Sequence, residues 1–478
     1  MSSASKVFHY FEEICKIPHG SHNCKEISDY CVTFAKERNL FVRQDKLFNV
    51  VIVKEATKGY EQVPTVILQG HLDMVCEKNE DTSHDFLTEP LELYKEGDFI
   101  AAKGTTLGGD DGIAIAYCLA LLDDDEISHP RLEVLFTVEE EVGMEGATYL
   151  DVSELKGKYL INIDNEEEGV LLTSCAGGLK AQAVLPITRT SVKGQGITLK
   201  IQGLLGGHSG AEIHKQRANA NVLMGRLLYE LGDFLEIVNI RGGLKDNAIA
   251  REAFLDGVVA EENLQKVKDK ITQLTNVFQK EYSKMEDNIC IQIEQTGQVT
   301  KEVYDKKTKE KTITFLMSAL NGVYTMSAHI NGLVESSQNL GVMSEEDNKL
   351  IFSFAVRSAV ASLKKLLSDK IKVLIESLGG TYIESGQYPE WEYKETSKLR
   401  ELFKKSYETL YQKEMKVEAI HAGLECGIFA SKMQEVDIVS FGPDIFDIHT
   451  PKERLSISST ERTWELLLHV LKNTKKLV

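Results

Sequence analysis

The chain has 478 residues, a hydrophobic content of 42% and a formal net charge of −18. The hydrophobic content supports a large core and argues against disorder, and the length predicts two or three domains. The negative charge excludes nucleic acid as an expected partner, because its phosphates would be repelled. The eight cysteines form no CxxC pair and are too sparse for a disulfide framework, so we expect reduced thiols and a cytoplasmic protein.

The first residues predict neither a secretory signal nor a membrane anchor. Glu12 and Glu13 stand where a signal peptide would need an apolar core. No window of about 18 uninterrupted apolar residues occurs, so no contact with a membrane is expected.

From residue 1 to about 185, helical and strand patterns alternate. An amphipathic helix is expected over 3–17 and a buried helix over 111–124. The expected strands are 47–55, 63–70, 131–140 and 158–164. Strands separated by helices predict an α/β fold with a mainly parallel sheet, whose sites lie at the carboxyl ends of the strands.

The pattern changes from about residue 186. Strand, helix, strands, a charged helix over 262–282 and a strand over 288–295 come first. After a Lys-rich, hairpin-like stretch at 300–313, a similar order recurs, with strands at 314–324 and 349–358 and a helix at 362–379. This predicts an α+β domain of two ferredoxin-like βαββαβ units in tandem.

The α/β style returns from about residue 394. A helix over 398–413, a strand over 435–442 and a last helix that Ser458 and Glu461 would open as a capping box are expected. The middle block is therefore interpreted as an insertion. The predicted domains are a catalytic domain formed by 1–185 and 394–478, and an inserted lid or dimerisation domain at 186–393.

Charged side chains gather where these elements begin or end. In VPTVILQGHLDMVCE, residues 63–77, His71 and Asp73 would face one site, because residues i and i+2 of a strand point the same way. Each such residue alone is typical of a solvated loop or a helix cap. Together they predict one charged site at one edge of the sheet. The others are Asp110, Asp111, Glu139, Glu140, Glu141, Asp164 and His449.

A pair of divalent cations would balance the charge of this site. Asp110, Glu141 and Asp164 would bring three negative charges together, which is costly without compensation. Imidazole and carboxylate ligands suit zinc or its first-row neighbours, and a mixed set with open positions is typical of a catalytic centre.

The sequence resembles the aminoacyl-histidine dipeptidases (Xaa-His dipeptidases, carnosinase-like). These belong to a superfamily of cocatalytic zinc peptidases that includes aminoacylase and carboxypeptidase G. The matching segments run in the family's order from about residue 66 to 452. They are LQGHLDMV, KGTTLGGDDGIAIA, TVEEEVGMEGA, LINIDNEEEG with SCAGG, GGHSGAEIHK, NAIARE, HAGLECGIF and HTPKE.

The resemblance implies an enzyme with two divalent metal ions, with Zn²⁺ expected and Mn²⁺ or Co²⁺ as alternatives. Asp110 would bridge the ions and Asp73 would orient the ring of His71. Glu140 would be the general base for a metal-bridged hydroxide that attacks the peptide carbonyl. The implied metal ligands are His71, Asp110, Glu141, Asp164 and His449.

Two departures from the family's pattern stand near these residues. The family usually shows Asp-Asn where this chain has Asp110-Asp111, a bond that the resemblance implies to be cis. Three glutamates occur in a row at 139–141, so the pair of base and ligand could be shifted by one position.

The resemblance implies that His208 donates to the oxyanion, whereas a histidine between glycines is by itself typical of a loop. A dipeptidase must also measure the length of its substrate, which a cationic or amide clamp on the terminal carboxylate would do. Asn247, Arg357 and the turn before Glu425 are the candidates. Arg357 could instead form an interstrand salt bridge, Glu425 could contact the substrate's amino group, and the role of His421 stays open.

The leading hypothesis is a cytoplasmic metallopeptidase that hydrolyses small dipeptides of the Xaa-His type, such as β-alanyl-histidine. The alternatives are a tripeptidase, an aminoacylase or another amidohydrolase at the same dizinc site. A metal-binding homologue without turnover is a further alternative, against which the intact glutamates argue. A homodimer is one expectation for assembly.

Overall fold

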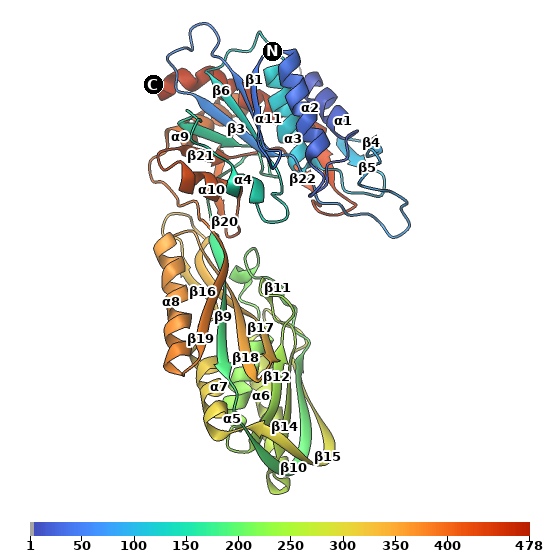
Figure 1. Ribbon diagram of the computed structural model, residues 1–478, viewed down its shortest axis with the longest axis vertical. Coiled ribbons are helices and arrows are strands. Elements are labelled where there is room, and N and C mark those ends of the chain that lie inside the picture. Colours follow the sequence, from blue (N-terminus) through green and yellow to red (C-terminus); the bar gives the residue numbers. More distant parts are fainter. Residues whose placement is uncertain (1–3) are drawn as a thin grey trace. The chain divides into compact units, whose positions relative to one another are not determined.

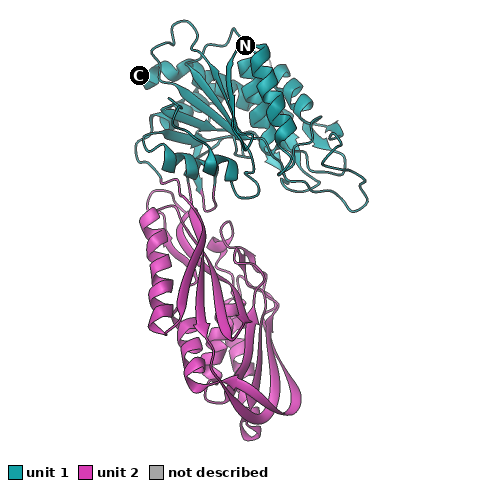
Figure 2. Ribbon diagram, viewed as in Figure 1, with its two compact units in different colours: residues 1–174, 393–419, 424–478 teal, residues 175–392, 420–423 magenta. Residues whose placement is uncertain are grey.

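The computed structural model describes residues 4–478, so residue 3, where the first predicted helix starts, lies outside it. The chain forms two compact units (Figure 2). Unit 1 comprises residues 1–174, 393–419 and 424–478, and unit 2 comprises 175–392 and 420–423. The main boundaries between the two units lie near residues 174 and 392. The predicted domain boundaries lie near 185 and 393. The roles of catalytic domain and lid stay predictions.

Unit 1 is built on a mixed sheet with helices around it (Figure 1). Its helices are α1 (Ser5–Ile14), α2 (Lys25–Glu37), α3 (Gly109–Leu122), α4 (Glu145–Tyr149), α9 (Lys398–Tyr411), α10 (Glu425–Lys432) and α11 (Ile457–Asn473). The strands of the main sheet are β1 (Phe41–Gln44), β2 (Val50–Lys54), β3 (Val66–His71), β6 (Leu132–Thr137), β7 (Tyr159–Asn162), β8 (Val170–Cys175), β20 (Lys416–Ile420) and β21 (Asp437–Ser440). A smaller sheet contains β4 (Leu93–Glu96), β5 (Phe99–Ala102), β22 (Ile445–Phe446) and β23 (Arg454–Ser456).

The main sheet has the order β1-β2-β6-β3-β7-β21-β8-β20. Its centre, β6-β3-β7-β21, is parallel, and antiparallel pairs flank it. Every residue of β2, β3, β6 and β7 is buried, as expected of strands covered on both faces. The predicted α/β class is confirmed, and the parallel centre brings the carboxyl ends of β6, β3 and β7 to one edge.

Unit 2 carries a nine-stranded sheet among the described residues, in the order β15-β10-β14-β12-β17-β18-β9-β19, with β16 beside β17. Helices α5 to α8 share one apolar core with it. The helices are α5 (Ala220–Leu231), α6 (Leu264–Glu281), α7 (Lys306–Ser318) and α8 (Ala361–Ser377). The strands are β9 (Gly177–Pro186), β10 (Arg189–Gln202), β12 (Leu235–Gly242), β14 (Ala253–Val259), β15 (Cys290–Tyr304), β16 (Gly322–Met326), β17 (Val334–Glu346), β18 (Lys349–Ser358) and β19 (Thr381–Tyr388), with the short pair β11 (Gly207–His208) and β13 (Ala248–Ile249).

Two βαββαβ units build this sheet, and they are nested. One unit runs β10-α5-β12-β14-α6-β15 without interruption. The other begins with β9 and continues, after the first unit is complete, as α7-β17-β18-α8-β19. The prediction of a tandem order was wrong because β9, the first strand of the outer unit, precedes the whole inner unit in sequence.

The Lys-rich segment after β15 forms helix α7, so the predicted hairpin at 300–313 and the predicted strand at 314–324 were wrong. The side chain of Asp305 accepts a hydrogen bond from the backbone N–H of Thr308 and caps the helix. Thr308, Thr312 and Phe315 are buried at helical spacing, and this packing outweighs the low helix propensity of the threonines.

The last helix is capped two residues earlier than predicted. Ser456, and not Ser458, caps α11, because its Oγ accepts from the N–H of Ser459. Ser458 instead donates its hydroxyl to Asp98. No helix among residues 4–478 is both long and apolar enough to cross a membrane.

Candidate metal centre

Three neighbouring strands and one helix deliver the predicted site residues to one edge of the unit 1 sheet. His71 is the last residue of β3, Glu140 and Glu141 follow β6, and Asp164 follows β7. Because these strands are parallel and adjacent, their carboxyl ends lie side by side. Asp110 lies in the first turn of α3, which packs on β3.

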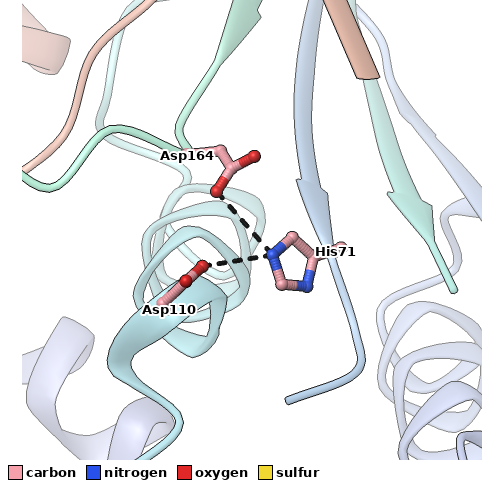
Figure 3. A group of neighbouring side chains, drawn as sticks. All are labelled: His71, Asp110 and Asp164. Carbon is pink, nitrogen blue, oxygen red and sulfur yellow. Dashed lines mark hydrogen bonds and ion pairs between the residues drawn. The ribbon is translucent and has the colours of Figure 1, made fainter. Parts of the chain in front are cut away.

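Asp110 stands between the two histidines. Its Oδ1 lies 3.2 Å from His71 Nε2, and its Oδ2 lies 3.1 Å from His449 Nε2. Asp164 Oδ1 is 3.7 Å from His71 Nε2 (Figure 3), and Glu141 Oε1 is 2.9 Å from His449 Nε2. Among the described residues, three groups could each hold a metal ion, with the ligand atoms of each within 4.8 Å of one another. Two of them share Asp110: His71-Asp110-Asp164 and Asp110-Glu141-His449. The third is His71-Glu140-Glu141. We call the residues of the two groups that share Asp110 the His–carboxylate cluster: His71, Asp110, Glu141, Asp164 and His449.

The electrostatics of the cluster fit a pair of divalent cations. Burial and the nearby Asp110 raise the pKa of the Asp164 carboxyl to about 6, although His71 opposes this. Hydrogen bonds with Asp110 and Glu141 raise the pKa of His449 to about 10. The His449 shift means that Asp110 and Glu141 stabilise positive charge beside them. A set of imidazole nitrogens and carboxylate oxygens suits zinc, manganese or cobalt.

Asp73 holds the loop that carries the two glutamates. Its carboxylate accepts from the backbone N–H groups of Glu140, at 3.0 Å, and Glu141, at 3.3 Å. His71 Nδ1 lies 2.9 Å from the carbonyl oxygen of Asp73 and 3.6 Å from its carboxylate. The His71 ring therefore contacts the backbone carbonyl of Asp73, while the carboxylate of Asp73 binds the loop.

The three consecutive glutamates point to different partners. Glu139 binds His22, whose Nδ1 lies 2.7 Å from its Oε2. Glu141 contacts His449, whereas Glu140 lies beside His71. Burial raises the pKa of Glu140 well above its usual range, although His71 opposes this. This arrangement favours Glu140 as the base and Glu141 as the ligand over a shifted register.

Glu425 begins helix α10 and is fully buried behind the strand ends. Its Oε2 accepts from Gln69 Nε2 at 2.6 Å and from the Thr137 hydroxyl at 2.7 Å. Asn162 donates in turn to Gln69 Oε1 at 2.6 Å. Burial raises the pKa of Glu425 to about 7. Sequence reasoning missed Gln69, Thr137 and Asn162, although polar residues inside otherwise apolar strands were a usable signal.

Asp111 takes the place where the family usually shows asparagine. The peptide between Asp110 and Asp111 is cis, as the resemblance implied. Asp111 is buried, and its Oδ2 accepts from the backbone N–H of His71 at 3.1 Å. Burial, with Asp164 nearby, raises its pKa well above the usual range. If protonated, the Asp111 side chain would offer both a hydrogen-bond donor and an acceptor, as an asparagine side chain does.

Gly70 allows helix α3 to approach strand β3. A Cβ at this position would lie 2.5 Å from Ala114 Cβ and 2.6 Å from Asp111 Oδ2. We expect Gly70→Ala to lower the free energy of unfolding by about 1–3 kcal/mol, because the added methyl group overpacks this contact. Denaturation by urea measures the change. A variant as stable as the unaltered protein would contradict the close approach.

In unit 2, three candidate residues surround Gly210. A Cβ there would lie 2.6 Å from the carbonyl oxygen of His421, 3.1 Å from His208 Cε1 and 3.2 Å from Arg357 Nε. The backbone N–H groups of Gly210 and Ala211 donate to His208 Nδ1. This assigns the ring proton to Nε2 and leaves that nitrogen as the donor.

Arg357 is only 9% exposed on β18. Its Nη1 donates to the Tyr388 hydroxyl at 2.7 Å, and its buried Nε has no hydrogen-bond partner among residues 4–478. No carboxylate in the described chain lies within ion-pair distance of it, so the interstrand salt bridge finds no partner. A buried guanidinium with a free donor suits an anionic ligand.

Asn247 and His421 are the remaining candidate residues in unit 2. The backbone carbonyl of Asn247 accepts from Ser209 N–H, next to His208. Asn247 and His208 also line a cavity of about 1000 Å³. His421 Nε2 lies 2.7 Å from the Ser337 hydroxyl, and burial, with Arg357 nearby, lowers its pKa to about 3. His421 is therefore neutral at physiological pH.

Comparisons with known proteins agree with this geometry. Residues 67–473 match the sequence profile described as Peptidase family M20/M25/M40. The chain is 37% identical to the cytosol non-specific dipeptidase of Escherichia coli (strain K12), over 98% of each chain. The crystal structure of the aminoacylhistidine dipeptidase from Vibrio alginolyticus has a TM-score of 0.93 at 38% identity, covering 98% of this chain and 97% of that one.

A more distant structure shares the fold alone. The aminopeptidase PepT from Bacillus cereus has a TM-score of 0.57 at 14% identity, with 98% of each chain covered. The family profile spans most of the chain and includes every member of the His–carboxylate cluster. This chain therefore belongs to Peptidase family M20/M25/M40.

Proposed function

We propose that this protein is a metal-dependent dipeptidase that hydrolyses dipeptides of the Xaa-His type, such as β-alanyl-histidine. The observation that carries the proposal is the pair of ligand groups sharing Asp110 at the edge of a peptidase-family sheet. The relatives with 37% and 38% identity are named as dipeptidases, which supports the same activity here.

The His–carboxylate cluster would hold two divalent ions, for which we infer zinc. His71 and Asp164 would bind one ion, Glu141 and His449 the other, and Asp110 both. Bound ions of this kind polarise a peptide carbonyl and lower the pKa of a water molecule. Open coordination positions on such a centre suit catalysis rather than a structural role.

Glu140 would move the proton in this reaction. It would accept a proton from the attacking water and pass it to the leaving amine, so that the amine departs neutral. Its raised pKa suits a group that must hold the proton between these steps. Asp73 would keep the backbone of Glu140 in place through their 3.0 Å hydrogen bond.

Residues of unit 2 would recognise the rest of the substrate. His208 Nε2–H would donate to the oxyanion that forms when the carbonyl is attacked. Arg357 would bind the terminal carboxylate, with Asn247 as a further polar contact. Glu425 stays a candidate for the substrate's amino group, since one of its oxygens has no partner among the described residues.

We expect Arg357→Ala to lower kcat/KM for a dipeptide by roughly 30-fold or more, because it removes a buried charge-assisted contact. Steady-state rates on a dipeptide and on its C-terminal amide measure the effect. The loss should be large for the free carboxylate and small for the amide, which has no charge to bind. An equal loss for both would show that Arg357 acts only through structure.

A matched control for this experiment is Arg226→Ala. Arg226 lies in the same unit, but it forms a surface ion pair with Glu281. Exposed ion pairs contribute little, so the two substrates should keep their rates.

A panel of substrates tests the activity itself. Purified protein loaded with zinc would be given Xaa-His dipeptides, other dipeptides, tripeptides and N-acyl amino acids. Cleavage of dipeptides with the highest kcat/KM supports the proposal. A preference for tripeptides or N-acyl amino acids would favour the tripeptidase or aminoacylase alternative. No turnover of any substrate would favour the non-catalytic homologue.

We further infer a cytoplasmic location, and a homodimer is one of two proposed states of assembly. In the other, the second βαββαβ unit stands in for a partner subunit. The eight cysteines are all free thiols, as in a reducing compartment. Sedimentation equilibrium of the full chain tests assembly: a mass of one chain, 53.5 kDa, would contradict the dimer.

A further inference from the structure

Glu453 is a buried carboxylate that binds the backbone of the loop leading to Asp110. Its Oε2 accepts from the N–H of Leu107 at 2.8 Å and of Gly108 at 3.2 Å. Its Oε1 accepts from Gly109 at 2.8 Å and from Asp110 at 3.4 Å. Both oxygens are therefore used, and four consecutive N–H groups converge on one anion, as in an anion-binding nest.

The loop can form this nest because of its glycines. Gly108 has a φ of +67°, which favours glycine, and a Cβ there would lie 2.8 Å from Met74 Sδ. A Cβ on Gly109 would lie 3.2 Å from Glu453 Oε1. The side chain of Glu453 is enclosed, since the residue is 3% exposed.

The same residue is joined to His449 by a short, fixed turn. The N–H of Glu453 donates to the carbonyl of Thr450 at 3.1 Å. Arg454 Nη1 lies 2.5 Å from Asp447 Oδ2, and His449 lies between these two residues in the sequence. Glu453 thus connects two segments far apart in sequence, one carrying Asp110 and the other carrying His449.

Its charge is the feature that needs an explanation. Glu453 belongs to none of the ligand groups, and it adds a buried carboxylate near that of Asp110. Such a charge is costly, and a neutral glutamine of the same shape would avoid the repulsion. Glutamine, however, can accept at only one of its two terminal atoms, so it would leave part of the loop's N–H groups without a partner.

We infer that Glu453 is a positioning residue that fixes the distance between Asp110 and His449, and thereby sets the metal affinity of the group that these two form with Glu141. This rests on the metal centre proposed above. Glu453 touches neither metal nor substrate; it acts through the loop and the turn.

Glu453→Gln tests the inference in the full chain, with zinc as the probe. Competition with a chromophoric chelator gives the two dissociation constants, and elemental analysis after dialysis gives the metal content. We expect at least one of the two dissociation constants, that of the site formed by Asp110, Glu141 and His449, to rise roughly 10–100-fold, the usual effect of removing a residue that orients a ligand.

Glu133→Gln is the matched control. Glu133 is also buried, at 1% exposure, and accepts from the backbone N–H groups of Lys156 and Gly157. It lies near the start of β6, whereas Glu140 follows the end of that strand. This control should lower the melting temperature and leave both zinc affinities unchanged, so it separates lost stability from lost positioning.

Zinc affinities unchanged in Glu453→Gln would overturn the inference, and so would an equal loss in Glu133→Gln. If Glu453→Gln gives no folded protein, Glu453→Asp takes its place. Aspartate keeps the charge but is one methylene too short for the nest, so its zinc affinity should also fall, and unchanged affinity overturns the inference. An unaltered protein that binds no zinc would instead overturn the metal centre itself.

Discussion

Glu140→Gln should lower kcat by roughly 10²–10⁴ while both metals stay bound, because a positioned general base contributes about this much. Glutamine keeps the shape of the side chain and the backbone hydrogen bond to Asp73, but it cannot take a proton. Substrate binding should change little. Steady-state kinetics, together with elemental analysis of the purified variant, measure the effect.

The neighbouring glutamates supply the controls. Glu141→Gln should lose metal affinity first, since Glu141 contacts His449 within a ligand group, and excess zinc should restore part of its rate. Glu139→Gln should keep its metals and its rate, because Glu139 binds His22. If Glu141→Gln is inactive with its metals bound while Glu140→Gln loses metal, the base and the ligand are swapped. If Glu139→Gln is the inactive, metal-loaded variant, the register is shifted by one position. Full activity in all three would refute the mechanism.

Removal of the metals should abolish activity. The carboxylates of the cluster would then have only the cluster's two histidines to balance them, and the polarisation of the carbonyl that a bound ion would supply is lost. Zinc, manganese or cobalt should restore the rate on addition. The melting temperature should fall as well, because ions that bind only the folded state stabilise it.

Dialysis against a chelator, with elemental analysis of the product, provides the test. A parallel sample treated with calcium-saturated chelator controls for effects of the chelator itself. Full hydrolysis by protein shown to be free of metal would contradict the proposed centre.

The α/β unit and the cluster could be predicted from the sequence because both depend on local patterns. Buried strands end at a polar residue, and parallel strands bring those ends together, so the pattern alone places His71, Glu141 and Asp164 at one edge of the sheet. Their arrangement agrees with that expectation. Their roles as ligands stay predictions until the metal is measured.

Features that depend on residues far apart in the chain could not be predicted from the sequence. The nesting of the two βαββαβ units depends on β9 pairing with β18, a partner more than 160 residues away, which no local period reveals. Helix α7 was missed because its threonines favour a strand locally, and only packing against the sheet decides otherwise. Glu453 lies in the matching segment HTPKE, but the sequence assigned it no role, since its partners are backbone N–H groups, which residue types do not reveal.

Because unit 1 is made of separate stretches of the chain, its sheet can be completed only late in translation. Strand β21, at Asp437–Ser440, lies between β7 and β8 in the sheet, so a ribosome has made nearly the whole chain before this gap can close. The main segment of unit 2, residues 175–392, is in the nascent chain before β21 is made, and domains generally fold as units while synthesis proceeds. His449 emerges after β21, so the growing polypeptide carries Asp110 and Asp164 for most of translation without the last member of their cluster. Until then the half-made sheet exposes apolar strands, which makes this stage the one at which a chaperone would be most needed.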